Sequence, residues 1–169
     1  MHRNGHYGAA LLGYAPLGLV TLAAGFEVAG VGGAVVSVGL AMVPDWDMRL
    51  PNVAHRGPTH TVRFALGVGA VMGAAGAVSS YLLGHGPLLS AGVATFGVAV
   101  GTTAILSHIG ADALTPMGVE PLGDGRTYSL EVCRADSLFG NYGLLILGFI
   151  AALLSYWVGQ GVHVFLSGY

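Results

Sequence analysis

Residues 43–63 read VPDWDMRLPNVAHRGPTHTVR, a polar stretch that lies between two long apolar runs. The stretch contains two aspartates and two histidines, Asp45, Asp47, His55 and His60. Ionisable side chains in such a setting are typical of a polar site at the end of a bundle of membrane helices. We therefore predict that this stretch forms half of a metal site, and that the rest of the chain supplies the other half.

The composition argues against a soluble globular domain. Of the 169 residues, 54% are hydrophobic and 8% are charged, whereas soluble domains carry about 25% charged residues. The mean hydropathy is +0.72. Length and composition together predict a single integral membrane domain over residues 1–169. The net charge of -2 gives no indication of a nucleic-acid partner.

Apolar runs of about 17–25 residues are long enough to cross a membrane as helices. Five such runs predict an all-α integral membrane helical bundle, with spans near residues 7–25, 28–44, 61–83, 88–113 and 141–166. Pro16 lies inside the first run, so a kinked helix is expected there. A signal peptide is the alternative for this run, with Arg3 as its basic region and cleavage near Gly25, although the run is long for that purpose.

The arginines predict the orientation of the bundle. Five crossings place the amino terminus, the loop at 45–60 and the loop at 114–140 on one side of the membrane. All six arginines fall on that side: Arg3, Arg49, Arg56, Arg63, Arg126 and Arg134. By the positive-inside rule, we expect a multi-pass protein of the plasma or inner membrane with a cytoplasmic amino terminus.

Small residues predict which spans pack closely. Gly69 and Gly73 in the third run, and Gly97 and Gly101 in the fourth, are each four residues apart, which suits close helix contact. Chance spacing in a chain with 29 glycines is the alternative. The single cysteine, Cys133, excludes an internal disulfide and a cysteine-rich metal site.

The second half of the predicted site lies at the end of the fourth run. His108 and Asp112 are four residues apart, so on a helix both side chains can reach one ion. The fourth run ends on the same side as the 43–63 stretch, and His6 precedes the first run on that side too. Any one of these residues taken alone is better explained as a solvated or capping residue. Their convergence at one membrane surface favours a shared metal site.

Electrostatics also favours a cation. Asp45, Asp47 and Asp112 follow or end helices, where the helix dipole penalises a carboxylate, whereas His60 precedes a helix, where the dipole favours the neutral ring. Imidazole and carboxylate ligands suit zinc best, with Mn²⁺ or Fe²⁺ as alternatives, and a bridging aspartate permits two ions roughly 3.5–4 Å apart. Asp47 and His55 are the residues that we expect either to transfer protons or to orient a ligand.

Two arginines are candidates for binding an anionic substrate. Arg56 lies between the two histidines of the polar stretch, and Arg126 lies in a glycine-rich, polar loop that can fold over the site. Guanidinium groups bind phosphate through forked hydrogen bonds. Orientation in the membrane alone explains Arg3, Arg49 and Arg63.

The motifs resemble those of the membrane-bound metal-dependent hydrolases, the LexA-regulated inner-membrane hydrolases of bacteria and their archaeal relatives. The matching pieces are His6, Pro44–Asp47, His55–His60 and His108–Gly118. That family is distantly similar to the zinc-dependent phospholipase C and single-strand nuclease superfamily. The resemblance implies metal-ligand roles for five residues, with Asp112 as the bridging carboxylate: His6, Asp45, His60, His108 and Asp112. Further downstream ligands of the soluble members have no counterpart here, because the only later histidine, His163, belongs to the other face; we therefore expect one or two zinc ions.

These inferences predict a zinc-dependent membrane hydrolase that acts on phosphoesters, such as lipid head groups, at the cytoplasmic face. Its expected partners are the lipid bilayer and a small-molecule or phospholipid substrate, and the sequence does not predict an oligomeric state. The alternative is a non-enzymatic metal-binding membrane protein, either a transporter component or a structural bundle. Transport sites usually lie near the bilayer midplane, whereas these ligands gather at helix ends.

Overall fold

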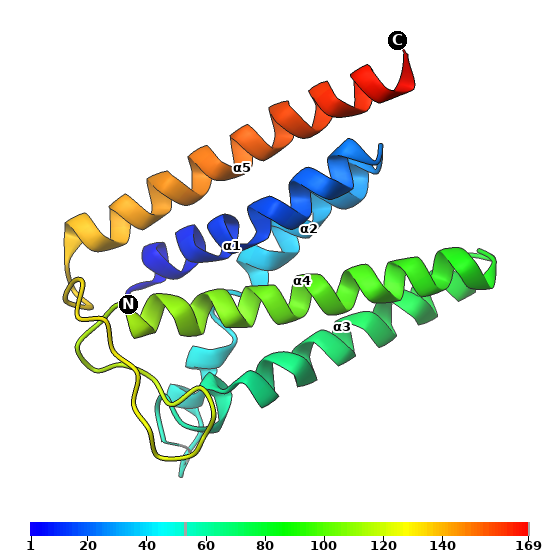
Figure 1. Cartoon of the computed structure of the whole chain (residues 1–169). Coiled ribbons are helices and arrows are strands. Elements are labelled where there is room, and N and C mark those ends of the chain that lie inside the picture. The colour runs from blue at the N-terminus through cyan, green and yellow to red at the C-terminus, as the bar shows by residue number, and fades with distance from the viewer. Residues whose placement is uncertain (53, 169) are drawn as a thin grey trace.

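The computed structural model describes residues 1–52 and 54–168 and is built from helices (Figure 1). The five α-helices are α1 (Arg3–Ala23), α2 (Glu27–Leu40), α3 (Val62–Leu82), α4 (Pro87–Ala113) and α5 (Leu138–Ser167). Two short 3-10 helices, η1 (Pro44–Arg49) and η2 (Pro58–His60), lie in the polar stretch between α2 and α3. No strand forms within the described ranges, so the predicted all-α class is confirmed.

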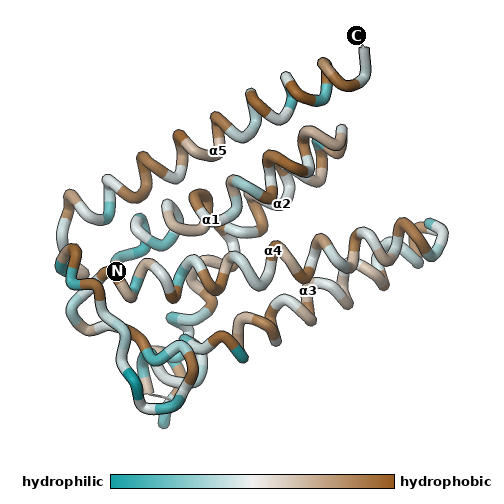
Figure 2. The backbone as a smooth tube through the Cα atoms, in the orientation of Figure 1, coloured by the Kyte–Doolittle hydropathy of each residue, from teal (hydrophilic) through white to brown (hydrophobic). Residues whose placement is uncertain are grey.

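Four of the predicted spans are long and apolar enough to cross a membrane. They are the segment Glu27–Arg49, which comprises α2 and η1, and the helices α3, α4 and α5. Helix α1 forms with Pro16 inside it but is not among the four. The prediction that the chain crosses the membrane five times, and the orientation derived from that number, therefore remain predictions. Hydrophobic residues follow the helices, and hydrophilic residues gather in the loops at the end of the bundle near the amino terminus (Figure 2).

The helix ends follow local sequence chemistry. The Thr61 hydroxyl accepts a hydrogen bond from the backbone of Phe64 and caps α3, and Ser137 caps α5 through the backbone of Gly140. Pro87 is the first residue of α4. A backbone N–H at this position would have no intrahelical acceptor, so the N–H that proline lacks costs the helix no hydrogen bond. Pro44 begins η1 four residues after α2 ends at Leu40. These signals leave His60 one residue before the cap of α3, at the same end of the bundle as η1.

The helices associate mainly as two pairs, α1 with α5 and α3 with α4 (Figure 1). At the α3–α4 contact, a methyl group on Gly97 would lie 2.6 Å from the carbonyl oxygen of Met72. Gly69, Gly73 and Gly101 also face the neighbouring helix closely. The close helix contact expected at these four glycines is confirmed, and the structure shows that it joins α3 to α4.

We expect Gly97→Ala to destabilise the bundle, because the new methyl group would overlap the backbone of α3. Overpacking of this kind costs about 1–3 kcal/mol. The matched control is Gly92→Ala on the same helix, where an added methyl group meets no atom within 4 Å. Thermal denaturation in detergent should show a lower midpoint for the Gly97 variant only. Equal midpoints for both variants would contradict the close α3–α4 contact.

Candidate metal centre

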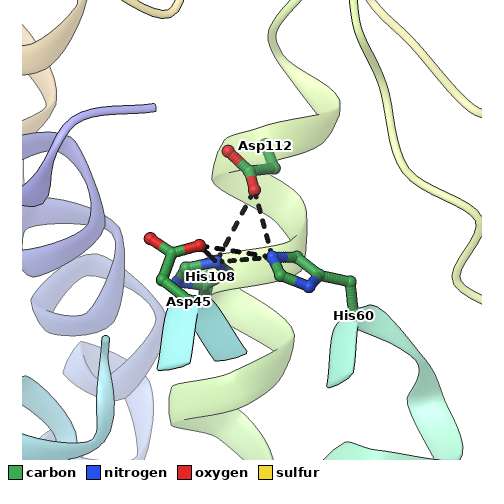
Figure 3. A group of neighbouring side chains, drawn as sticks. All are labelled: Asp45, His60, His108 and Asp112. Carbon is green, nitrogen blue, oxygen red and sulfur yellow. Dashed lines mark hydrogen bonds and ion pairs between the residues drawn. The ribbon is translucent and has the colours of Figure 1, made fainter. Parts of the chain in front are cut away.

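Four acidic and imidazole side chains from three separate segments converge at one end of the bundle (Figure 3). Asp45 comes from η1, His60 from η2, and His108 and Asp112 from the last turns of α4. All four residues are buried, and the two histidine side chains are fully so. Arg56 and the amino group of Met1 compensate Asp112 at Oδ1, whereas the ion-pair partners of Asp45 among the described residues are histidines. A buried carboxylate is costly without a positive charge, so the space between Asp45 and the two Nε2 atoms favours a cation or a proton.

The spacing of the four donor atoms fits one tetrahedral ion. His60 Nε2 and His108 Nε2 are 3.1 Å apart. Asp45 Oδ1 lies 3.5 Å and 3.4 Å from these two nitrogens, and Asp112 Oδ2 lies 3.5 Å from each. A tetrahedral zinc with bonds of about 2.05 Å has donor atoms about 3.3 Å apart. The five separations match this value closely.

The hydrogen bonds of the two histidines turn both Nε2 lone pairs toward the same point. His108 Nδ1 lies 2.6 Å from the carbonyl oxygen of Ala41, which can only accept, so Nδ1 carries the hydrogen of the neutral ring. The Thr59 hydroxyl donates to Asp47 and therefore accepts from His60 Nδ1 at 3.0 Å. In these tautomers, the two neutral rings point the lone pairs of their Nε2 atoms at each other across 3.1 Å. Such a contact repels unless a cation or a proton lies between the nitrogens.

The second oxygen of Asp112 faces a different group of residues. His6 Nε2 lies 3.6 Å from Asp112 Oδ1 and 3.9 Å from Asp45 Oδ2. The His6 ring stacks on His108 with centroids 3.7 Å apart, and the amino group of Met1 also contacts Oδ1. Asp112 therefore presents one oxygen to the tetrahedral group and the other to His6, as a carboxylate bridging two ions would.

Asp47 and His55 form a second layer behind His60. The Asp47 carboxylate accepts hydrogen bonds from His55 Nδ1 at 3.0 Å and from the Thr59 hydroxyl at 2.8 Å. It also lies 3.4 Å from His60 Nδ1, on the side of the ring away from the cluster. Asp47 thus orients His60, and the His55 side chain, which is 37% exposed, links the site to the surface.

The two candidate substrate arginines have different surroundings. Arg56 reaches into the centre, where its Nη2 donates to Asp112 Oδ1 at 2.8 Å and its Nη1 donates to Thr115 and to the carbonyl of Gly118. The Arg126 side chain is 79% exposed and pairs with Asp124. Among the described residues, no hydrogen bond or ion pair joins Arg126 to the cluster.

Sequence reasoning missed the supporting threonines and the direct contact between Arg56 and Asp112. Thr59 was adjacent to a predicted ligand, but its link to Asp47 depends on the path of the loop. Thr115 lies one helical turn beyond Asp112, a spacing that can indicate a supporting role. Arg56 has a φ of 61°, in the left-handed region, and its backbone N–H donates to Asp47. This rarely adopted conformation is held by the site itself.

The charge balance of the centre changes the pKa of His60. Burial lowers the pKa of His60, but its hydrogen bonds to Asp112 and Asp45 outweigh burial and raise the pKa above 6.5. The two carboxylates thus stabilise a positive charge on the neighbouring ring when no metal is bound. A divalent cation would satisfy the same demand.

A family model described as YdjM inner membrane protein matches residues 1–167. This match covers the helices, the polar stretch and every residue of the centre. Searches of curated proteins and of solved structures found no match.

Proposed function

The chain belongs to the YdjM inner membrane protein family, and we propose that it is a zinc-dependent phosphoesterase of the membrane surface. The observation that carries the proposal is the tetrahedral spacing of Asp45, His60, His108 and Asp112 at the end of an apolar bundle. Imidazole and carboxylate together suit zinc, with Mn²⁺ or Fe²⁺ as alternatives. A catalytic zinc has three protein ligands and one position for water or substrate, so hydrolysis at this centre would require one of the four donors to leave its position.

The donor set supports one ion at the tetrahedral position and a second beside His6. Asp112 would contribute an oxygen to each ion. His6 Nε2 lies 3.1 Å from the carbonyl oxygen of Met1, so it would have to release this contact to bind the second ion. When bound, such ions would act as Lewis acids on a phosphoryl oxygen and would lower the pKa of a water molecule. Asp45, His60 and His108 would hold this arrangement rigidly, because each is buried and hydrogen-bonded or packed on its neighbours.

The residues around the ions have separable roles. Asp47 would keep His60 in the tautomer that a metal requires. His55 would take up or release a proton at the exposed side of the centre, because its other nitrogen is held by Asp47. Arg56 would balance the charge of Asp112 and present its remaining N–H to an anionic group.

Purified protein should contain one or two zinc ions per chain and should hydrolyse phospholipids or simple phosphodiesters in a chelator-sensitive manner. Elemental analysis measures the first property, and phosphate or head-group release with and without chelator measures the second. Stoichiometric metal without turnover on any phosphoester would support the non-enzymatic alternative, a metal-stabilised bundle.

We expect His55→Gln to reduce turnover by about 10²–10⁴-fold, the usual contribution of a general acid or base. The metal content should change little, because His55 contacts Asp47 and the edge of the His60 ring but supplies none of the four donor atoms. The pH profile of kcat should lose one limb, which a purely structural residue would not affect. His163→Gln is the matched control, because His163 lies near the carboxyl-terminal end of α5, at the end of the bundle opposite the centre. A fall in metal content equal to the fall in turnover would instead identify His55 as a ligand.

A further inference from the structure

An open groove of about 1040 Å³ lies beside the metal centre, between α3 and the segment that joins α2 to η1. Its apolar wall on α3 consists of Phe64, Gly67, Val68 and Val71, which share one helical face. Leu40 and Val43 form part of the opposite wall. Since α3 and Glu27–Arg49 are candidate membrane spans, this groove would be open to the hydrocarbon of the bilayer.

The groove has a polar end that points to an anionic ligand. Arg56 and Arg63 line this end, together with one carboxylate, Glu120. The Arg56 side chain is only 9% exposed, yet its Nε–H has no hydrogen-bond partner among the described residues. A buried guanidinium N–H without an acceptor is costly, so a small movement of the Arg56 side chain that brings this N–H to a ligand oxygen in the groove would be favourable.

The groove and the metal centre meet at Arg56. Its Nη2 donates to Asp112 in the centre, and Arg56 is also one of the residues that line the groove. A phosphate that accepts a hydrogen bond from Nε would therefore lie next to the metal centre. The carbon chain attached to it would extend along α3, away from the centre and toward the membrane interior.

We propose that the groove binds an anionic membrane phospholipid, with one acyl chain along α3 and its phosphate at Arg56 and Arg63. As a statement about substrate, this inference rests on the proposed function, because it names a membrane lipid as the molecule hydrolysed. As a statement about binding, it is independent of any reaction. The substrate would reach the centre sideways from the bilayer rather than from water.

Gly67 provides a specific test, because a methyl group at this position meets no atom of the protein within 4 Å. Gly67→Ile would place a branched side chain in the groove, on a Cβ atom that meets no protein atom. The matched control is Gly39→Ile on α2, because a methyl group at Gly39 also meets no protein atom within 4 Å. The measured quantity is the ratio of kcat/KM for dioleoylphosphatidylglycerol to kcat/KM for bis(4-nitrophenyl) phosphate. We expect this ratio to be at least tenfold lower in the Gly67 variant than in the Gly39 control. An unchanged preference would overturn the assignment of the groove to the substrate.

Binding can be measured without turnover, because Trp46 lines the groove and the chain has only two tryptophans. A Trp157→Phe background leaves Trp46 as the sole tryptophan, which is excited selectively at wavelengths that tyrosine does not absorb. Brominated phosphatidylglycerol added to detergent-solubilised protein should quench Trp46 saturably in the Gly39→Ile variant and much less in the Gly67→Ile variant. Arg63→Gln should weaken the saturable quenching several-fold. Equal quenching in the two glycine variants would overturn the groove proposal, whereas normal quenching without any hydrolysis would contradict only the proposed enzymatic function.

Discussion

Asp112→Asn should deplete the protein of metal and abolish chelator-sensitive hydrolysis. The substitution preserves the shape of the side chain but removes the negative charge that both halves of the centre share. Asp112 Oδ2 lies 3.5 Å from the Nε2 atoms of His60 and His108, while Oδ1 faces His6 and Arg56. Loss of a supporting residue typically costs 10–100-fold in metal affinity, and loss of a bridging ligand should cost more than that.

The measurement is zinc content per chain after dialysis against a weak chelator, together with the rate of phosphoester hydrolysis. Asp136→Asn is the matched control, because Asp136 is exposed and pairs with Arg134 in the loop before α5. The control should retain both properties of the natural chain. Full zinc content in the Asp112 variant would refute the assignment of the centre.

Removal of the metal should destabilise the protein most strongly at alkaline pH. Without metal, a proton on His60 compensates Asp45 and Asp112, and this histidine has a pKa raised above 6.5. A raised pKa in the folded state adds stability that is fully present below 6.5 and is lost as the pH rises through the folded value. Metal binding has the opposite dependence, since protons compete with the ion for the same ligands.

The difference in melting temperature between zinc-loaded and chelated protein should therefore grow from pH 5.5 to pH 8. Zinc at a thousand times its Kd stabilises by about 4 kcal/mol, which corresponds to roughly 10 °C for a chain of this size. The Asp112→Asn variant should show little difference at either pH. A zinc effect that is constant over this range would indicate that the ion binds elsewhere than at the histidines.

Much of the architecture was predictable because hydropathy and helix signals act locally. The predicted spans at 61–83 and 88–113 correspond to α3 at Val62–Leu82 and α4 at Pro87–Ala113. The second span was predicted to reach residue 44, but α2 ends at Leu40 and Pro44 begins a separate 3-10 helix. The first helix begins at Arg3, earlier than its apolar run, because polar residues at a helix end do not prevent helix formation.

The grouping of the centre was predictable to a similar extent. A separation of four residues on a helix places His108 and Asp112 on one face whatever surrounds them. Between the polar stretch and the end of α4 the chain runs along α3 and returns along α4. This return places Asp45 and His60 at the same end of the bundle as His108 and Asp112. His6 and His55 were also expected on that side, and the structure brings both next to these residues.

The sequence by itself thus determined the all-α membrane bundle, the end at which the polar residues gather and the residue types that can bind a metal. The tertiary structure decided which atoms face one another: the two Nε2 lone pairs, the two oxygens of Asp112, and the Arg56 guanidinium between Asp112 and the groove. The reason is physical. Hydropathy and helical spacing act between near neighbours in the chain, whereas the 3.1–3.5 Å separations that define the centre arise from three segments held together by packing.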